Sequence, residues 1–177
     1  MLLELSKIQS PRERLDYTWP ESALDTSEDE FDVVAPIHLE LEVQKAGEDR
    51  FRLVGRARTT LEAACSRCVE PFRIPIDAPF DLSYLPQADN AGEPEREIQD
   101  DDLSTSFYRD GTIDLGGLLR EQFYLALPMK PLHDEHCRGL CPLCGTNLNR
   151  ETCECKVAWE DPRLAGLKSL LDEKKTN

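Results

Sequence analysis

The chain has 177 residues, of which 40% are apolar and 7% aromatic, and its 35 acids and 21 bases give a net charge of −14. This length suits one domain, or one domain with a small additional module. The acidic balance excludes duplex nucleic acid as a ligand of the bulk surface unless bases gather in one patch, and no stretch approaches the roughly 20 apolar residues that cross a bilayer.

Residues 1–20 begin the chain with a polar and basic stretch. Its first part, MLLELSKIQSPRER, has neither a long apolar run nor a small-residue cleavage site. We therefore expect no signal peptide and a cytoplasmic location without a membrane. In a reducing compartment, clustered cysteines indicate metal ligands or redox groups before they indicate disulfides.

Two acidic segments interrupt the chain at 21–32 and 87–104. The first carries six acids and no base, and the second carries seven acids and one base. Runs of like charge are usually solvated. Both segments are therefore predicted to be surface loops, and the second, with its Gly and Pro, is long for a connection between elements.

Strands are predicted where apolar and polar side chains alternate with a period of two. The pattern holds over 37–44, 53–61, 72–76 and 80–84, and a turn is predicted at 45–49. Sequential strands with short links favour an antiparallel meander with one face in solvent.

Helices are predicted over 110–127 and 161–175. Asp114 is suited to cap the first, and Pro128 follows its end. Its apolar face would consist of Leu115, Leu118, Leu119, Phe123 and Ala126. The second has a stripe of leucines, which predicts docking to its own domain or to a partner.

These elements predict an α+β fold, namely an antiparallel β-sheet meander with a few helices and a C-terminal zinc-stapled loop module. The α+β domain would span 1–132 with its two acidic loops. The cysteine-rich module and the last helix would span 133–177, where the last 41 residues carry seven bases against six acids.

Four cysteines near the C-terminus have the spacing of a metal site. Cys141-Pro-Leu-Cys144 is followed by a glycine that permits a tight turn, and Cys153-Glu-Cys155 supplies a second pair eight residues later. Four thiolates suit Zn²⁺ with no open coordination position, which makes such a site structural. The metal would then replace a hydrophobic core in this module.

The other three cysteines leave room for a second ion. Cys65 and Cys68 lie at the end of a predicted strand, and Cys137 follows two histidines. A Cys3His site would take His136 as its preferred fourth ligand, with His133 as the fallback. Other divisions stay open, such as Cys137 joining the first site while Cys153 or Cys155 is unused.

Each cysteine also has a simpler interpretation. Free cysteines are often small buried apolar residues, and either histidine could lie at the surface. Cys65 and Cys68 could instead form a redox dithiol, because Arg67 would lower a thiol pKa. A redox Cys-x-x-Cys normally opens a helix, whereas this one ends a strand.

No catalytic motif emerges. His133-Asp-Glu135 followed by Cys141-Pro-Leu-Cys144 is similar to the zinc deaminase pattern, but the two parts are too close together and the proline lies inside the pair. Metalloprotease, nucleophile-elbow and P-loop motifs are absent. We expect a protein without enzymatic activity and without a small-molecule substrate.

The sequence resembles the YceD family, the large ribosomal RNA subunit accumulation proteins, over roughly residues 30–172. The motifs that carry the resemblance are CSRCVEPF (65–72), LALP (125–128), CRGLCPLCGTNLN (137–149), DPRL (161–164) and LKSL (167–170), together with Ile113-Asp-Leu and Glu121. Some members of the family lack the distal cysteines, which implies that Cys141, Cys144, Cys153 and Cys155 form a separable site.

The resemblance implies an accessory factor in large-subunit ribosomal RNA accumulation or ribosome assembly. The acidic charge favours basic ribosomal or assembly proteins as partners. Contact with large-subunit rRNA stays open as an alternative; it would involve the bases of the near-neutral C-terminal module, namely Arg138, Arg150, Lys156, Arg163 and Lys168. The alternatives are a zinc-stabilised protein-interaction adaptor unrelated to ribosomes and a thiol oxidoreductase that uses Cys65 and Cys68.

Overall fold

The computed structural model describes residues 1–47, 49–87 and 104–155. The chain divides into two compact units, Met1–His133 and Asp134–Asn177. The predicted loop over 87–104 and the predicted helix over 161–175 lie almost wholly or wholly outside the described residues. Within the part of the chain that is described, no helix is long and apolar enough to cross a membrane.

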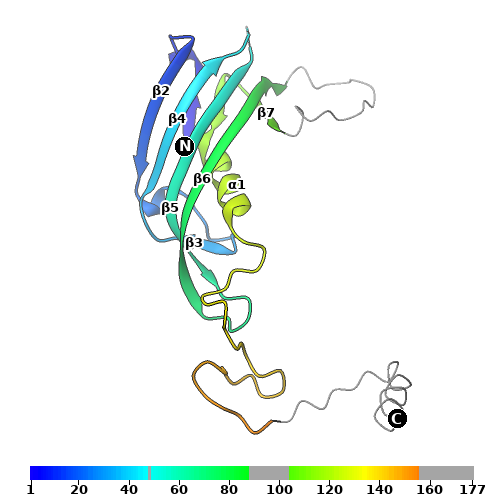
Figure 1. The fold of residues 1–177 in the computed structure, drawn as a ribbon. Coiled ribbons are helices and arrows are strands. Elements are labelled where there is room, and N and C mark those ends of the chain that lie inside the picture. Colours follow the sequence, from blue (N-terminus) through cyan, green and yellow to red (C-terminus); the bar gives the residue numbers. More distant parts are fainter. Residues whose placement is uncertain (48, 88–103, 156–177) are drawn as a thin grey trace, which may run out of the picture. The chain divides into compact units, whose positions relative to one another are not determined.

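The first unit is built on a twisted sheet with the strand order β2-β4-β5-β6-β7, and a short strand, β3, also pairs with β5 (Figure 1). The bounds are Arg12–Trp19 for β2, Phe31–Val33 for β3, Ile37–Lys45 for β4, Phe51–Ala64 for β5, Pro71–Pro86 for β6 and Thr105–Tyr108 for β7. All the pairs are antiparallel except β6 with β7, which is parallel. A separate two-stranded sheet joins β1 (Leu2–Glu4) to β8 (Thr112–Asp114).

The period-two pattern in the sequence is confirmed along β4 and β5. In β4 the side chains of Ile37, Leu39, Leu41 and Val43 are buried, and those between them point to the other face. The predicted runs 72–76 and 80–84 are wrong as separate strands, because both belong to the single 16-residue strand β6. Asp77, Ala78 and Pro79, which separate the two runs in the sequence, stay extended and pair with Arg58, Ala57 and Arg56 of β5.

Two segments without predicted strands also contribute to the fold. Residues 1–20 supply β1, the short 3₁₀ helix η1 (Leu5–Lys7) and β2. The acidic segment 21–32, predicted to be a solvated loop, contains the 3₁₀ helix η2 (Glu21–Ala23) and the start of β3, and it buries Leu24 and Phe31. Apolar residues between the acids therefore reach the core.

The helix α1 (Leu115–Ala126) lies against β6 (Figure 1), and Asp114 caps it as predicted. The Asp114 carboxylate accepts a hydrogen bond of 2.9 Å from the Gly116 N–H. The buried residues of α1 are Leu115, Gly116, Leu118, Leu119, Gln122 and Phe123. The expectation for Ala126 is wrong: it is exposed, because the chain leaves the helix at Leu127 in an extended conformation.

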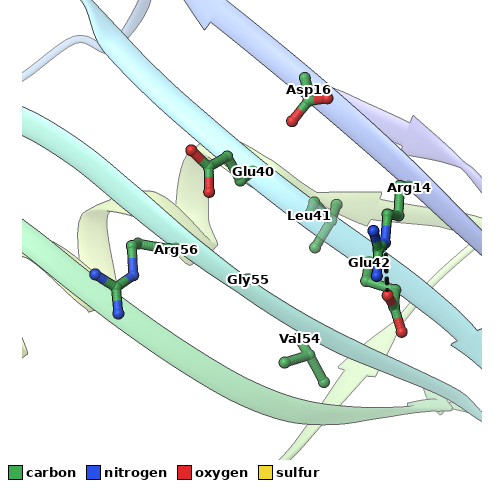
Figure 2. A pocket seen from close by; sticks show the side chains of 8 residues that line it. All are labelled: Arg14, Asp16, Glu40, Leu41, Glu42, Val54, Gly55 and Arg56. Carbon is green, nitrogen blue, oxygen red and sulfur yellow. Dashed lines mark hydrogen bonds and ion pairs between the residues drawn. The ribbon is translucent and has the colours of Figure 1, made fainter.

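The outer face of the main sheet is charged, with opposite signs on neighbouring strands. Ion pairs join Arg14 to Glu42, Arg58 to Glu40, Arg56 to Asp77, and Arg52 to Asp81, at 2.5–3.0 Å between N and O atoms. Figure 2 shows Arg14 of β2 reaching Glu42 of β4. Both residues line a depression of about 420 Å³ on this face. The pairs are exposed, so each contributes at most about 1 kcal/mol.

The inner face of the sheet contains one very close approach. Gly55 of β5 lies opposite Phe80 of β6. A Cβ on Gly55 would lie 2.5 Å from the Glu40 carbonyl oxygen and 2.6 Å from Cζ of Phe80. Only glycine fits this position without a shift of the backbone or of the Phe80 ring.

The described part of the second unit, residues 134–155, has no helix or strand longer than the isolated bridge between Leu140 and Asn147. Within that part, the only buried side chains are those of Cys137 and Cys141. Turn hydrogen bonds, such as the 2.9 Å bond from the Leu148 N–H to the Gly139 carbonyl, hold its backbone. Nothing in this segment amounts to a hydrophobic core.

Candidate metal centres

Four thiols of the second unit converge on one point. The Sγ atoms of Cys141, Cys144, Cys153 and Cys155 lie within 4.8 Å of one another. Sulfur atoms bound at ~2.3 Å around one tetrahedral ion lie about 3.8 Å apart, so the arrangement fits a metal ion. All seven cysteines of the chain are free thiols, and none is joined in a disulfide.

The backbone around Cys141 forms a tight loop that presents the first two thiols. The Gly145 N–H donates to the Cys141 carbonyl at 2.9 Å, and the Cys141 N–H donates to the Thr146 carbonyl at 2.8 Å. Gly145 has a φ of 73°, in the left-handed region that glycine adopts without strain. We call residues 141–146 the distal knuckle.

The four distal thiols have unequal acidities because they interact with one another. Hydrogen bonds with the side chain and backbone of Thr146 lower the pKa of Cys144 to about 6. The hydrogen bond with Cys144, together with burial and charge repulsion, raises the pKa of Cys155 to about 12. Four negative sulfurs at this spacing therefore repel one another unless a cation lies between them.

A second group of ligand atoms lies in the first unit. Cys65 and Cys68, in the link between β5 and β6, are almost fully buried. The Nδ1 atom of His133 lies 3.4 Å from Sγ of Cys68, and the ligand atoms of all three residues lie within 4.8 Å of one another. This group and the distal group could each hold a metal ion.

The link between β5 and β6 repeats the geometry of the distal knuckle. The Val69 N–H donates to the Cys65 carbonyl at 2.8 Å, and the Cys65 N–H donates to the Glu70 carbonyl at 2.9 Å. We call residues 65–70 the proximal knuckle. Two segments without sequence identity outside the cysteines thus adopt the same loop, which is the loop that presents two thiolates to one ion.

The proximal knuckle has a valine where the distal knuckle has its glycine. Val69 has a φ of 61°, and its side chain is 65% exposed. A β-branched residue in the left-handed region is a genuine outlier that costs about 1–2 kcal/mol. The hydrogen bonds of the knuckle, rather than burial of the valine, hold it there.

Two effects act in opposite directions on the Cys65 thiol. Burial opposes ionisation, but hydrogen bonds from the backbone of His133, Arg67 and Cys68 and from the His133 side chain outweigh it and lower the pKa of Cys65 to about 5. Cys65 is thus prepared as a thiolate, which is the form that binds metal. A 2.8 Å hydrogen bond from the Ser66 N–H to the Pro131 carbonyl joins the knuckle to the segment that carries His133.

The sequence predictions for the proximal site agree with the structure in part. The structure brings His133, the fallback ligand, to Cys68, whereas the preferred His136 is in neither group of converging ligand atoms among the described residues. The His136 N–H instead donates to the Asp134 carboxylate at 2.6 Å. Cys137, which belongs to the second unit, is buried, and its Sγ accepts a 3.3 Å hydrogen bond from the Asn149 side chain.

Comparison with known proteins supplies the family. The family model described as large ribosomal RNA subunit accumulation protein YceD matches residues 53–171. No solved structure gives a significant match.

Three curated relatives carry the same name. The chloroplastic YCED homologues 1 of Zea mays and Arabidopsis thaliana are 29% and 24% identical, over 60% and 78% of this chain, but the chain covers only 44% and 49% of their lengths. The YceD protein of Haemophilus influenzae is 27% identical over 76% of this chain and 78% of its own. Since the family match spans both knuckles and more than half of the residues, the chain belongs to the YceD family of large ribosomal RNA subunit accumulation proteins.

Proposed function

We propose that this protein is a non-enzymatic accessory factor in large-subunit ribosomal RNA accumulation, acting in ribosome assembly by binding basic ribosomal or assembly proteins. Its family and the names of its relatives support the ribosomal role. The observation that carries the choice of partner is charge: residues 1–133 contain 27 acids and 14 bases. Such a surface attracts basic proteins and repels the phosphates of RNA.

The proposed ion in both groups of ligand atoms is zinc, and the chemistry of thiolate and imidazole ligands supports this choice. Four thiolates fill a tetrahedral Zn²⁺ site and leave no position for a substrate, which makes the distal site structural. For the proximal site, Cys137 is the proposed fourth ligand because it follows His133 by only four residues in the chain. When bound, the metal supplies cross-links that stabilise these loops, and it takes part in no reaction.

The burial of Cys65 and Cys68 supports a structural role over thiol exchange. Their exposed fractions are 1% and 4%. A redox dithiol must present at least one sulfur to its substrate disulfide. A low thiol pKa alone, as at Cys65, serves metal binding equally well.

Sucrose-gradient sedimentation of cell extracts tests the ribosomal role. We expect the tagged protein to co-sediment with large-subunit precursors at low salt and to dissociate as ionic strength rises, because the attraction of an acidic surface for basic proteins is screened. Sedimentation only with free proteins at low salt would contradict the proposal and favour an adaptor unrelated to ribosomes.

Elemental analysis of protein purified without added metal tests the two sites. Two zinc ions per chain are expected, and a Cys68→Ser variant should retain one. One ion in the wild-type protein would confine the metal to a single site, and none would contradict the structural role of zinc altogether.

A further inference from the structure

A groove with apolar walls lies in the first unit beside the proximal knuckle. It has a volume of about 480 Å³. One wall consists of Ala63 and Ala64, at the end of β5, and Ser66 of the knuckle. The other wall is formed by Leu127, Pro128, Met129 and Pro131, which follow α1. We call it the apolar groove.

Two exposed large apolar side chains, those of Tyr124 and Met129, line this groove. Among the described residues of the first unit, six large apolar side chains are exposed, and four belong to the proximal knuckle, to the end of α1 or to the segment that follows α1. These four are Val69, Tyr124, Leu125 and Met129. Met129 is 100% exposed and Leu125 is 78% exposed, although each could pack if a partner covered it. Exposed apolar side chains that line a groove on a highly charged protein are typical of an interaction surface.

The edge of the groove is polar and fixed in place. Tyr124, which lines the groove, bonds through its hydroxyl to the Asp29 carboxylate at 2.9 Å and to the Glu30 N–H at 3.3 Å, and its ring packs against Phe31. Aromatic residues and methionine are both enriched in protein interfaces. The ring of Tyr124 is therefore in place before a partner arrives.

The charge at the groove indicates the chemistry of that partner. Of the residues that the structure describes, Glu30 is the only charged one that lines the groove, and it belongs to the acidic segment 21–32, which has no base. The nearby bases Arg67 and Lys130 are not among the lining residues. An apolar floor with an acidic edge disfavours RNA and fits an apolar side chain that has lysine or arginine beside it.

We propose that the apolar groove binds a segment of a basic protein, in which an apolar side chain enters the groove and a neighbouring lysine or arginine faces Glu30. This inference rests on the proposed function only in naming a ribosomal or assembly protein as the source of the segment. Any segment with these residues should bind to the apolar groove, whichever protein it comes from.

The proximal metal site ties the two walls of this groove together. Cys65 and Cys68 flank Ser66 on one wall, and His133 comes two residues after Pro131 on the other. The Ser66 N–H already donates to the Pro131 carbonyl at 2.8 Å. An ion held by these cysteines and His133 would fix the separation of the walls, so binding of the segment should depend on the metal site.

Fluorescence anisotropy with designed peptides tests which side chains the groove recognises. The measurement uses the full-length chain. The probe is a labelled peptide with two central leucines flanked by lysines; in the matched peptides, serines replace the leucines or glutamates replace the lysines. We expect both matched peptides to bind at least tenfold more weakly than the probe. Equal binding of all three, or tight binding only of the serine peptide, would overturn the proposal.

Variants of the exposed residues locate the binding site without disturbing the fold. Met129→Ser should raise the Kd of the leucine–lysine peptide about tenfold, whereas Leu2→Ser, an exposed residue of β1, should leave it unchanged. Glu30→Gln should reduce the preference for lysine over glutamate flanks. Cys68→Ser should weaken binding as its metal content falls by one ion. If that variant does not fold, Met129→Ser and Glu30→Gln still test whether the peptide binds at the apolar groove. Unchanged Kd values in both variants would show that it does not.

Site-specific photocrosslinking in cells separates this inference from the proposed function. With a benzoylphenylalanine at position 129, the crosslinked segment should carry an apolar residue next to Lys or Arg and should come from a ribosomal or assembly protein. A segment of that chemistry from an unrelated protein would uphold the groove and contradict the ribosomal role. The control places the same crosslinker at position 2. Crosslinks to RNA, or no more crosslinks from position 129 than from position 2, would contradict binding of a protein segment at the groove, even if the protein sediments with precursors.

Discussion

At the scale of single residues, the two knuckles form a natural comparison. Val69 and Gly145 occupy equivalent positions, with φ values of 61° and 73° and equivalent hydrogen bonds to the first cysteine of each loop. Glycine adopts this conformation freely, whereas valine is strained in it. The cysteine spacing could be predicted from the sequence, but the strain could not, because no local pattern marks a valine with a positive φ.

Replacement of this valine should stabilise the first unit. We expect Val69→Gly to raise its free energy of unfolding by about 1 kcal/mol, because relief of strain exceeds the added entropy of the unfolded chain. Urea unfolding followed by fluorescence of the half-buried Trp19 measures the change. Arg67→Gly, in the same loop, is the control and should not be stabilising. A loss of stability in Val69→Gly would show that the valine side chain contributes to the loop.

Gly55 should be intolerant of even one added carbon. Gly55→Ala places a Cβ 2.5 Å from a backbone oxygen that cannot move away easily, so we expect a loss of about 2–3 kcal/mol in the free energy of unfolding. Thr60→Ala, on the other face of the same strand, should change stability by less than about 1 kcal/mol. Denaturant titration of the two variants compares them, and equal stabilities would contradict the close approach at Gly55.

At the scale of elements, a strand or helix could be predicted where its signal lies in residues close together in the sequence. The alternation along β4 and β5 and the cap of α1 could be predicted because each depends on neighbours in the chain. The strand β2 was missed although Leu15, Tyr17 and Trp19 alternate with exposed residues. Their side chains are only half-buried, and in the described part of the chain β2 lies at the edge of the sheet, beside β4. The charged residues around them make the alternation hard to recognise in the sequence.

The cap of α1 gives a prediction at this scale. Asp114→Ala removes the acceptor of the Gly116 N–H and should lower the free energy of unfolding by about 1 kcal/mol. Asp114→Ser should restore most of this loss, because a hydroxyl can also cap. Thermal unfolding of the two variants tests the assignment, which fails if serine is no better than alanine.

At the scale of the whole molecule, the two units obtain their stability from different sources. The first has an extensive apolar core, whereas the described part of the second buries little besides cysteines. Composition and cysteine spacing allowed this contrast to be predicted. The parallel pair of β6 with β7 and the apolar groove could not be predicted, because both depend on contacts between segments far apart in the chain.

Loss of a distal ligand should therefore affect one unit alone. Cys141→Ser is expected to remove one metal ion and to open residues 137–155 to protease, because metal binding supplies the folding energy of this segment. The unfolding temperature of the first unit should stay within a few degrees of that of the wild type. Elemental analysis, limited proteolysis and calorimetry measure the three effects. An unchanged metal content would contradict the distal site, and joint unfolding of both units would contradict their independence.

The close fit of Phe80 over Gly55 also determines how neighbouring strands can slide. On the outer face, several arginines of β5 lie near the aspartates of β6, so a shift of two residues would still bring Arg56 opposite Asp77 or Asp81. On the inner face the same shift would place the Phe80 ring against the side chain of Leu53 or Ala57. The glycine opposite that ring thus fixes the register of β5 and β6. A misaligned hairpin of these two strands would be destabilised at this one position during folding.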